Sequence, residues 1–284
     1  MTFLRSSITA LMGLSLASTA MAAAVIAADP FDGTSRVLDG ARRGTGWATA
    51  WSDRDQVNGR IVATKASDAP MSGKALRVQG NAATAATRQL RQTVSSNVLI
   101  SFDIQFDAGR LNTNDLFGLW LGGVAGPTIG LRGNCGTGQG CTDDLFVRTG
   151  ATGIGSTGVN ITLGTTYSIL GYLQKVDGSA VYNRFDLWVN PTEEDWTSLT
   201  GADITNFGIS GVSAFRKIGV RTANLETNDA VLMDNLRIGL ADPRPPALSP
   251  VAAPTTNPVP EPGTLALLGA ALVALTASVR RRQH

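Results

Sequence analysis

The chain has 284 residues, 32 glycines, 16% charged residues and a formal net charge of +2 at pH 7, and its single histidine is the last residue, His284. A near-neutral balance with scattered arginines gives no basic stripe, which argues against nucleic-acid binding. Without an earlier histidine, the chain cannot build a Ser-His-Asp or Cys-His centre or the usual histidine-containing zinc site.

The first residues have the pattern of a secretory signal peptide, which we place at residues 1–24. Arg5 precedes an apolar run over residues 8–17, and small residues follow up to Ala24. Ala20-Met21-Ala22 and Ala22-Ala23-Ala24 both fit the cleavage pattern, so two cleavage sites stay open. An uncleaved N-terminal anchor is the alternative interpretation.

Residues 25–240 form the main domain, and their hydrophobic periodicity is two, as in strands. From Ile100 to Phe106, apolar residues alternate with Ser101, Asp103 and Gln105. The strands predicted in this way cover residues 98–106, 116–121, 167–173, 184–189, 218–222 and 231–238. With glycine-rich turns between them and no amphipathic helix longer than two turns, the pattern predicts an all-β sandwich or barrel.

Four segments of this domain resemble those of the concanavalin A-like, laminin-G-like jelly roll. They are residues 46–51 with Gly46-Trp47, the strand over residues 100–106, residues 185–191 ending in Asn190-Pro191, and the closing strand over residues 231–239 with Asp234. The resemblance implies a jelly-roll β-sandwich. Because this fold hosts lectins, adhesion modules and glycoside hydrolases, it does not by itself settle a function.

Residues 241–258 change in composition and contain repeated prolines among alanine, serine, valine and threonine. Such a segment favours an extended, polyproline-like linker. A plain unstructured linker without further purpose is the simplest interpretation.

The last residues, 259–284, have three parts in a fixed order. Pro260-Glu261-Pro262 comes first, an uncharged apolar run over residues 264–279 follows, and Arg280, Arg281 and Arg282 close the segment. A helix of roughly sixteen residues is about 24 Å long, slightly shorter than the hydrocarbon core of a bilayer. The arginines are expected to keep that end in the cytoplasm, and the rest of the chain outside it.

This tail resembles the PEP-CTERM sorting signal of Gram-negative bacteria. The resemblance implies a precursor anchored in the inner membrane by a transmembrane helix and recognised by an exosortase-like membrane protease. The mature protein would then reach the cell surface or the extracellular matrix, which consists of exopolysaccharide. A plain C-terminal membrane anchor is the alternative.

The carboxylates of the domain give no familiar catalytic pattern. Its glutamates are Glu193, Glu194 and Glu226, and the Glu-x-Asp-x-x-Glu spacing of jelly-roll glycosidases does not occur. Glu193 and Glu194 follow Asn190-Pro191 and are assigned to a solvated loop. We therefore expect a protein that is not an enzyme, with a divergent glycoside hydrolase acting on matrix polysaccharide as the alternative.

Cys135 and Cys141 are the only cysteines, and they flank a short glycine-rich loop. In an oxidising compartment a disulfide is the expected state. Such a small closed loop would add about 2 kcal/mol at most to stability. A free cysteine pair is the alternative.

No cofactor is expected, although calcium stays open because it needs only oxygen ligands. Asp53 and Asp55 form one candidate ligand pair, and Asp143 and Asp144 beside the cysteine loop form another. Solvated loop aspartates are the alternative interpretation.

Three tryptophans are candidates for stacking on a sugar. Trp47, Trp51 and Trp196 lie near predicted turns, so an exposed position and a structural one both stay open for each, whereas Trp120 and Trp188 lie within apolar strands and are expected in the core. The partner expected from all these features is an extracellular polysaccharide or a surface protein. The function expected is that of a non-catalytic binding or structural module.

Overall fold

The structure is a computed structural model that describes residues 24–53, 59–81, 85–133, 143–150, 155–157 and 159–241. These ranges belong to the first of the two units into which the chain divides, Met1–Pro243, and the second unit is Arg244–His284. The expected signal peptide up to residue 23, and everything after residue 241, lie outside the described residues. Within the described ranges, no helix is long and apolar enough to cross a membrane.

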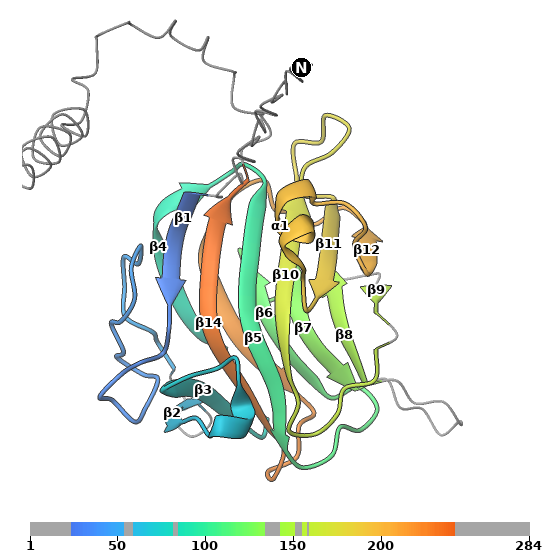
Figure 1. Ribbon diagram of the computed structural model, residues 1–284. Helices are drawn as coiled ribbons and strands as arrows, with labels where there is room; N and C mark the ends of the chain where they lie inside the picture. The colour runs from blue at the N-terminus through green and yellow to red at the C-terminus, as the bar shows by residue number, and fades with distance from the viewer. Residues whose placement is uncertain are drawn as a thin grey trace, which may run out of the picture. The chain divides into compact units, whose positions relative to one another are not determined.

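Two antiparallel sheets pack face to face (Figure 1). The eight-stranded sheet has the order β12-β11-β10-β5-β14-β3-β2, and β1 also pairs with β14. Its strands are β1 (Ala24–Asp29), β2 (Gly59–Ala63), β3 (Lys74–Gln79), β5 (Val98–Ala108), β10 (Thr166–Gln174), β11 (Arg184–Val189), β12 (Ile204–Phe207) and β14 (Ala230–Leu240).

The six-stranded sheet has the order β4-β13-β6-β7-β8-β9. Its strands are β4 (Ala86–Val94), β6 (Leu116–Leu121), β7 (Thr128–Gly133), β8 (Asp143–Arg148), β9 (Gly155–Ser156) and β13 (Phe215–Ala223). The described helical segments are short: a 3-10 turn, η1 (Ala66–Asp68), and one helix, α1 (Glu193–Ser198).

The alternation along β5 determines what each face of the eight-stranded sheet presents. Ile100, Phe102 and Ile104 are almost fully buried and belong to the main core between the two sheets. Successive side chains of a strand point to opposite faces, so Ser101 and Asp103 lie on the outer face of the sheet.

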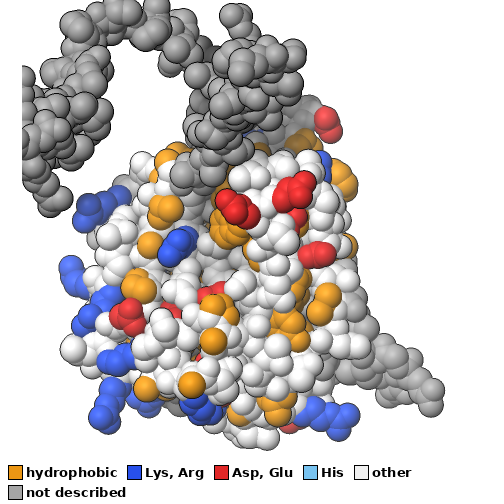
Figure 2. All heavy atoms as spheres, in the orientation of Figure 1, with side chains coloured by type: hydrophobic (Ala, Val, Ile, Leu, Met, Phe, Trp, Pro, Cys, Tyr) orange, Lys and Arg blue, Asp and Glu red, His pale blue; other side chains and the backbone are white. Residues whose placement is uncertain are grey.

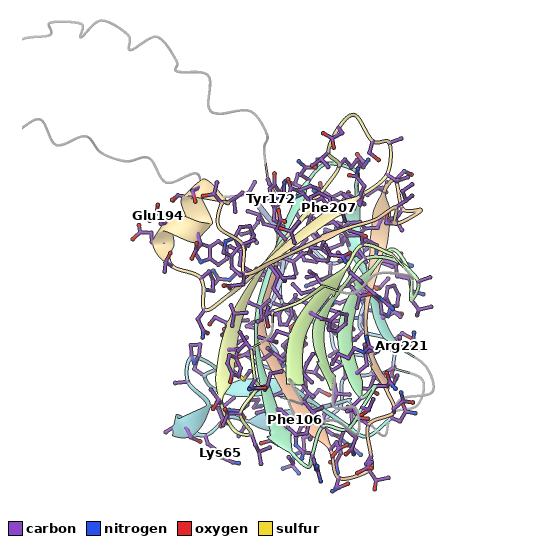
Figure 3. All side chains as sticks on the ribbon, turned by 90° about the vertical axis from the view of Figure 1, so that its right-hand side faces the viewer. Lys65, Phe106, Tyr172, Glu194, Phe207 and Arg221 are labelled. Atoms are coloured by element: carbon purple, nitrogen blue, oxygen red, sulfur yellow. The ribbon has the colours of Figure 1, made fainter. Side chains whose placement is uncertain are left out.

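The outer face of the eight-stranded sheet is apolar at both ends and polar between them. One cluster of buried residues consists of Leu99, Leu170, Trp188 and Ala241, against which Leu199 and Ala202 of the segment after α1 pack. The other consists of Met71, Ala75 and Leu232. Figure 3 shows α1, marked by Glu194, and the segment near Lys65 projecting on the same side of the sandwich, away from Arg221. The polar part of β5 lies between these two covered ends.

The prediction of an all-β jelly-roll sandwich is confirmed. The six predicted strands correspond to β5, β6, β10, β11, β13 and β14. The remaining strands were not predicted. One of them, β1, begins at Ala24, the last residue of the expected signal peptide, and pairs with the end of β14.

The assignment of Glu193 and Glu194 to a loop is wrong, because both lie in α1. Thr192 caps this helix, since its hydroxyl accepts the backbone N–H of Asp195 at 3.3 Å. In return the Asp195 carboxylate accepts the backbone N–H of Thr192 at 2.7 Å. This reciprocal capping box satisfies amides that a helix of six residues would otherwise leave without partners.

Candidate functional site: a groove on the outer face

A groove of about 450 Å³ lies on the outer face of the eight-stranded sheet, between the two covered ends. Its floor consists of polar side chains from three adjacent strands: Ser101 and Asp103 of β5, Ser168 of β10, and Asn235 and Arg237 of β14. Its walls include Pro191 and Trp196 on one side and Pro70 and Ser72 on the other. Figure 2 shows a few acidic and basic side chains near the centre of this face, and further basic side chains along its left and lower margins.

Asp103 is held in a fixed orientation at the centre of the floor. Its Oδ1 accepts a hydrogen bond from the Ser168 hydroxyl at 2.7 Å, and its Oδ2 accepts one from the Asn235 side-chain amide at 2.7 Å. Asn235 reaches this position because its φ is 53° and because the pairing of β14 with β5 shifts between Asp234 and Arg237. Asparagine tolerates this left-handed conformation, and such a bulge redirects the neighbouring side chains.

Asp234 lies directly opposite Asp103 in the pairing of β14 with β5. Opposite residues of an antiparallel pair point to the same face, but Asp234 is only 1% exposed and is not part of the groove lining. Burial raises the pKa of its carboxyl to about 7. The nearby carboxylates of Asp32 and Asp103 also raise this pKa, whereas hydrogen bonds from the backbone N–H groups of Asn235 and Ser72 lower it. Asp234 is therefore a buried acid beneath the wall formed by Ser72.

Trp196 is the exposed aromatic residue of the groove. It lies on α1, is 39% exposed, and lines the groove together with Pro191. The helix ends at Ser198, and its C-cap residue Leu199 adopts a left-handed conformation with φ of 52° and packs on the cluster around Trp188. The capped start and the packed end of α1 thus hold the indole of Trp196 over the edge of the polar floor.

Trp47 and Trp51, for which the sequence leaves exposure open, are buried. They are 7% and 2% exposed, and their indole N–H groups donate to Ala28 O at 2.9 Å and to Asp29 Oδ2 at 2.7 Å. The guanidinium of Arg88 lies 4.5 Å from the centre of the Trp47 ring and forms a buried ion pair with Asp29. Both indoles are therefore structural, and Trp196 is the candidate that is exposed. The burial of Trp120 and Trp188 is also confirmed.

Of the four candidate calcium ligands, only the side chain of Asp53 lies among the described residues. Asp53 is 3% exposed, and its backbone N–H donates to Asp39 Oδ1 at 2.8 Å. Asp143 and Asp144 begin β8, but their side chains lie outside the described residues, as does Asp55. Within the described ranges, no group of three or more histidine, cysteine, aspartate or glutamate side chains is placed to hold a metal. The calcium site stays a prediction.

Cys135 and Cys141 also lie outside the described residues, so the disulfide stays a prediction. The floor residues of the groove were not recognised as a site from the sequence. The alternation along residues 100–106 did place Ser101 and Asp103 on the face opposite the core. No signal in the sequence shows that Ser168, Asn235 and Arg237 lie beside them, because that proximity depends on strand order.

Residues 258–282 match a family model described as the PEP-CTERM protein-sorting motif. The chain thus carries this motif, which includes Pro260, Glu261 and Pro262. The match confirms the resemblance of the tail to the PEP-CTERM sorting signal. The motif indicates an exported, membrane-anchored precursor that is processed by an exosortase-type membrane protease and sorted to the cell surface. The match covers the tail alone and leaves the sandwich unassigned.

Among the solved structures to which the chain is similar at low identity are the following three. A protein of unknown function with a galectin-like fold from Bacillus subtilis has a TM-score of 0.46 and 11% identity, covering 78% of this chain and 98% of that one. A glycosyl hydrolase family protein from Mycobacterium fortuitum has a TM-score of 0.42 and 13% identity, covering 75% and 99%. The binding domain of Paraclostridial Mosquitocidal Protein 1 has a TM-score of 0.43 and 16% identity, covering 66% and 44%.

The chain thus spans less than half of the mosquitocidal binding domain. A comparison with curated protein sequences gives no significant match. Likenesses of this size do not separate binding from hydrolysis, so the chemistry of the groove itself has to carry any assignment of function.

Proposed function

We propose that the protein is a surface-sorted, non-catalytic module that binds a glycan in the groove over β5, β10 and β14. The observation that carries the proposal is a partly exposed Trp196 beside a floor of hydroxyl, amide, carboxylate and guanidinium groups. A pyranose ring has one apolar face and a rim of hydroxyl groups, and an aromatic wall beside a polar floor is complementary to both. The groove volume of about 450 Å³ lies within the usual range of small-molecule sites.

The expected partner is an extracellular polysaccharide, in keeping with the sorting motif. A glycan-array screen of the full chain in detergent, repeated with and without calcium, would identify the sugar, and calorimetry would then give its affinity. We expect Trp196→Ala to weaken binding by about tenfold or more, equivalent to ~1.4 kcal/mol. The calcium arm also tests the prediction for Asp53, Asp55, Asp143 and Asp144.

Phe207→Ala is the matched control, because Phe207 is another exposed aromatic residue, at 64%, that does not line the groove. Its affinity should equal that of the unchanged protein. If Trp196→Ala and Phe207→Ala bind the glycan as well as the unchanged chain does, the groove is not the binding site.

A glycoside hydrolase is the second candidate, and the observation in its favour is the adjacency of Asp103 and Asp234. A glycosidase needs two carboxyl groups that both reach the scissile bond at a set separation. Among the described residues that line the groove, Asp103 is the only carboxylate, while Asp234 is covered and Glu193 and Glu194 are not part of the lining. This arrangement supports binding without turnover.

Incubation of the full chain with the glycan identified on the array tests this choice. We expect no release of reducing sugar. Release that disappears in Asp103→Asn, or in Glu193→Gln with Glu194→Gln, would replace the binding proposal with hydrolysis.

A further inference from the structure

A second concave site lies at the edge of the sandwich, where the connection between β1 and β2 passes over β4. It has a volume of about 260 Å³ and is lined by Arg42, Arg88 and Arg91, by Trp47, and by nearby residues of the connection. Among the residues that the structure describes, no acidic one belongs to this lining. We call it the arginine pocket. Figure 2 shows basic side chains along the margin of the molecule where this connection runs.

Arg88 lines the pocket and holds its walls in place, but its positive charge is already paired with Asp29. Its side chain is 1% exposed and forms the ion pair with Asp29. Its Nε donates to Thr49 O at 3.0 Å and its Nη2 donates to Arg43 O at 2.6 Å. The guanidinium therefore ties the connection to β4, while Asp29 neutralises its charge.

Arg42 and Arg91 supply the positive charge that is left over. Both are exposed, and neither forms an ion pair among the described residues. Arg91 is oriented by one bond, from its Nε to Trp47 O at 3.2 Å, which leaves its terminal N–H groups without an acceptor among the described residues. Two guanidinium groups thus face a common hollow with no counter-ion from the described part of the chain.

The backbone of the connection adds hydrogen-bond donors. Gly44 and Gly46 have positive φ values of 73° and 81° and pack so closely on β1 that a Cβ at Gly44 would lie 1.8 Å from Ala28 O. The backbone N–H groups of Gly44, Gly46 and Thr49 have no acceptor among the described residues. Unbonded N–H groups in such a tight loop, beside guanidinium groups, are the donors that oxyanions prefer.

We propose that the arginine pocket binds a compact oxyanion, namely the sulfate, phosphate or carboxylate group of an acidic polymer or of a free salt. Arg42 and Arg91 provide charge-assisted hydrogen bonds, and the backbone of the connection supports them. The site is separate from the groove, since the two linings share no residue. It does not depend on the glycan proposed for the groove.

Binding of dextran sulfate, compared with uncharged dextran, by the full chain in detergent tests the pocket. The unchanged protein should bind the sulfated polymer only, and inorganic sulfate should compete. The double variant Arg42→Gln, Arg91→Gln should bind about tenfold more weakly or worse. The control Arg36→Gln, Arg60→Gln removes the same charge from exposed arginines outside the pocket and should keep the affinity.

Calorimetric titrations with sodium sulfate, phosphate and acetate then identify the preferred group. If a free salt binds as tightly as the polymer does, and only when Arg42 and Arg91 are present, the pocket takes the free anion. Equal loss in both double variants would show diffuse attraction to positive charge and overturn the proposal. So would failure of the unchanged protein to bind any of these anions. Trp196→Ala should leave dextran sulfate binding unchanged, which separates this test from that of the groove.

Discussion

Asp234 is a buried acid on the outer face of β14, and its burial affects the stability of the whole sandwich. Its pKa rises from the ordinary 3.8 to about 7, chiefly because burial disfavours the charged form. Between these two values the folded protein keeps a proton that the unfolded chain has already released. Stability must therefore fall as the pH rises through this range.

Replacement of Asp234 by asparagine should remove this pH dependence. The unchanged protein should lose at most ~4 kcal/mol of unfolding free energy between about pH 4 and pH 7, from roughly three pKa units. Denaturant unfolding at pH 4, 5.5 and 7 measures the slope for both proteins. The exposed turn residue Asp177 provides the control, because Asp177→Asn should keep the slope of the unchanged chain. Equal slopes in Asp234→Asn and the unchanged protein would contradict the assignment.

The candidate site could be predicted from the sequence only in part, and the reason is visible at single residues. The sequence indicated Trp196 as a candidate for stacking on a sugar, and the alternation along β5 placed Asp103 on the outer face. Trp47 and Trp51 have the same local sequence character, yet they are buried, because Arg88 and Asp29 meet them from distant parts of the chain. Contacts over such separations leave no periodic signal.

Among the elements, β1 is more important for the fold than its position at the start of the domain suggests. It pairs with β14 from Ala24 opposite Leu240 to Asp29 opposite Leu236. Ala27 is fully buried in the main core, and Asp29 holds both Arg88 and Trp51. A domain that begins at Asp29 would lose most of this strand.

We expect a chain that starts at Ala23 to be more stable than one that starts at Asp29. The shorter chain loses the ladder with β14 and the burial of Ala27, which together should cost several kcal/mol, at about 1 kcal/mol for each hydrogen bond. Thermal unfolding of the two forms measures the difference. Equal midpoints would show that β1 adds nothing. In the natural protein the same reasoning favours cleavage after Ala22, which N-terminal sequencing of the exported form would reveal.

The strands differ in how far the sequence predicts them. Those with unbroken alternation or apolar runs, such as β5 and β6, were predicted close to their observed bounds. β4 was missed because Arg88 takes an inward position where the pattern expects an apolar residue. β7 was missed because Gly130 interrupts it, where a Cβ would lie 2.2 Å from Phe117 O. In both strands a contact with a distant part of the chain determines the residue type, so the alternation of apolar and polar residues that predicts a strand is interrupted.

At the scale of the whole molecule, the matched sorting motif, residues 258–282, lies outside the strands of the described sandwich. Deletion of Pro260, Glu261 and Pro262 should leave the folded sandwich intact while the protein is retained in the membrane fraction, because the protease no longer recognises it. Fractionation followed by immunoblotting measures the shift. Deletion of Ala252, Ala253 and Pro254 from the linker removes the same number of residues and should leave release unchanged. Identical fractionation of both deletions would contradict a role for the motif.

The chain enters and leaves the sandwich at the same end, since Ala24 lies opposite Leu240. Beyond β14, Ala241 is 7% exposed, and its N–H donates to Asn97 O at 3.1 Å. The last residues of β14 are bonded to β5 on one side and to β1 on the other, so a pull along the axis of β14 would act on both ladders at once. The ladders would then be loaded in shear, so their bonds must stretch together rather than break one by one.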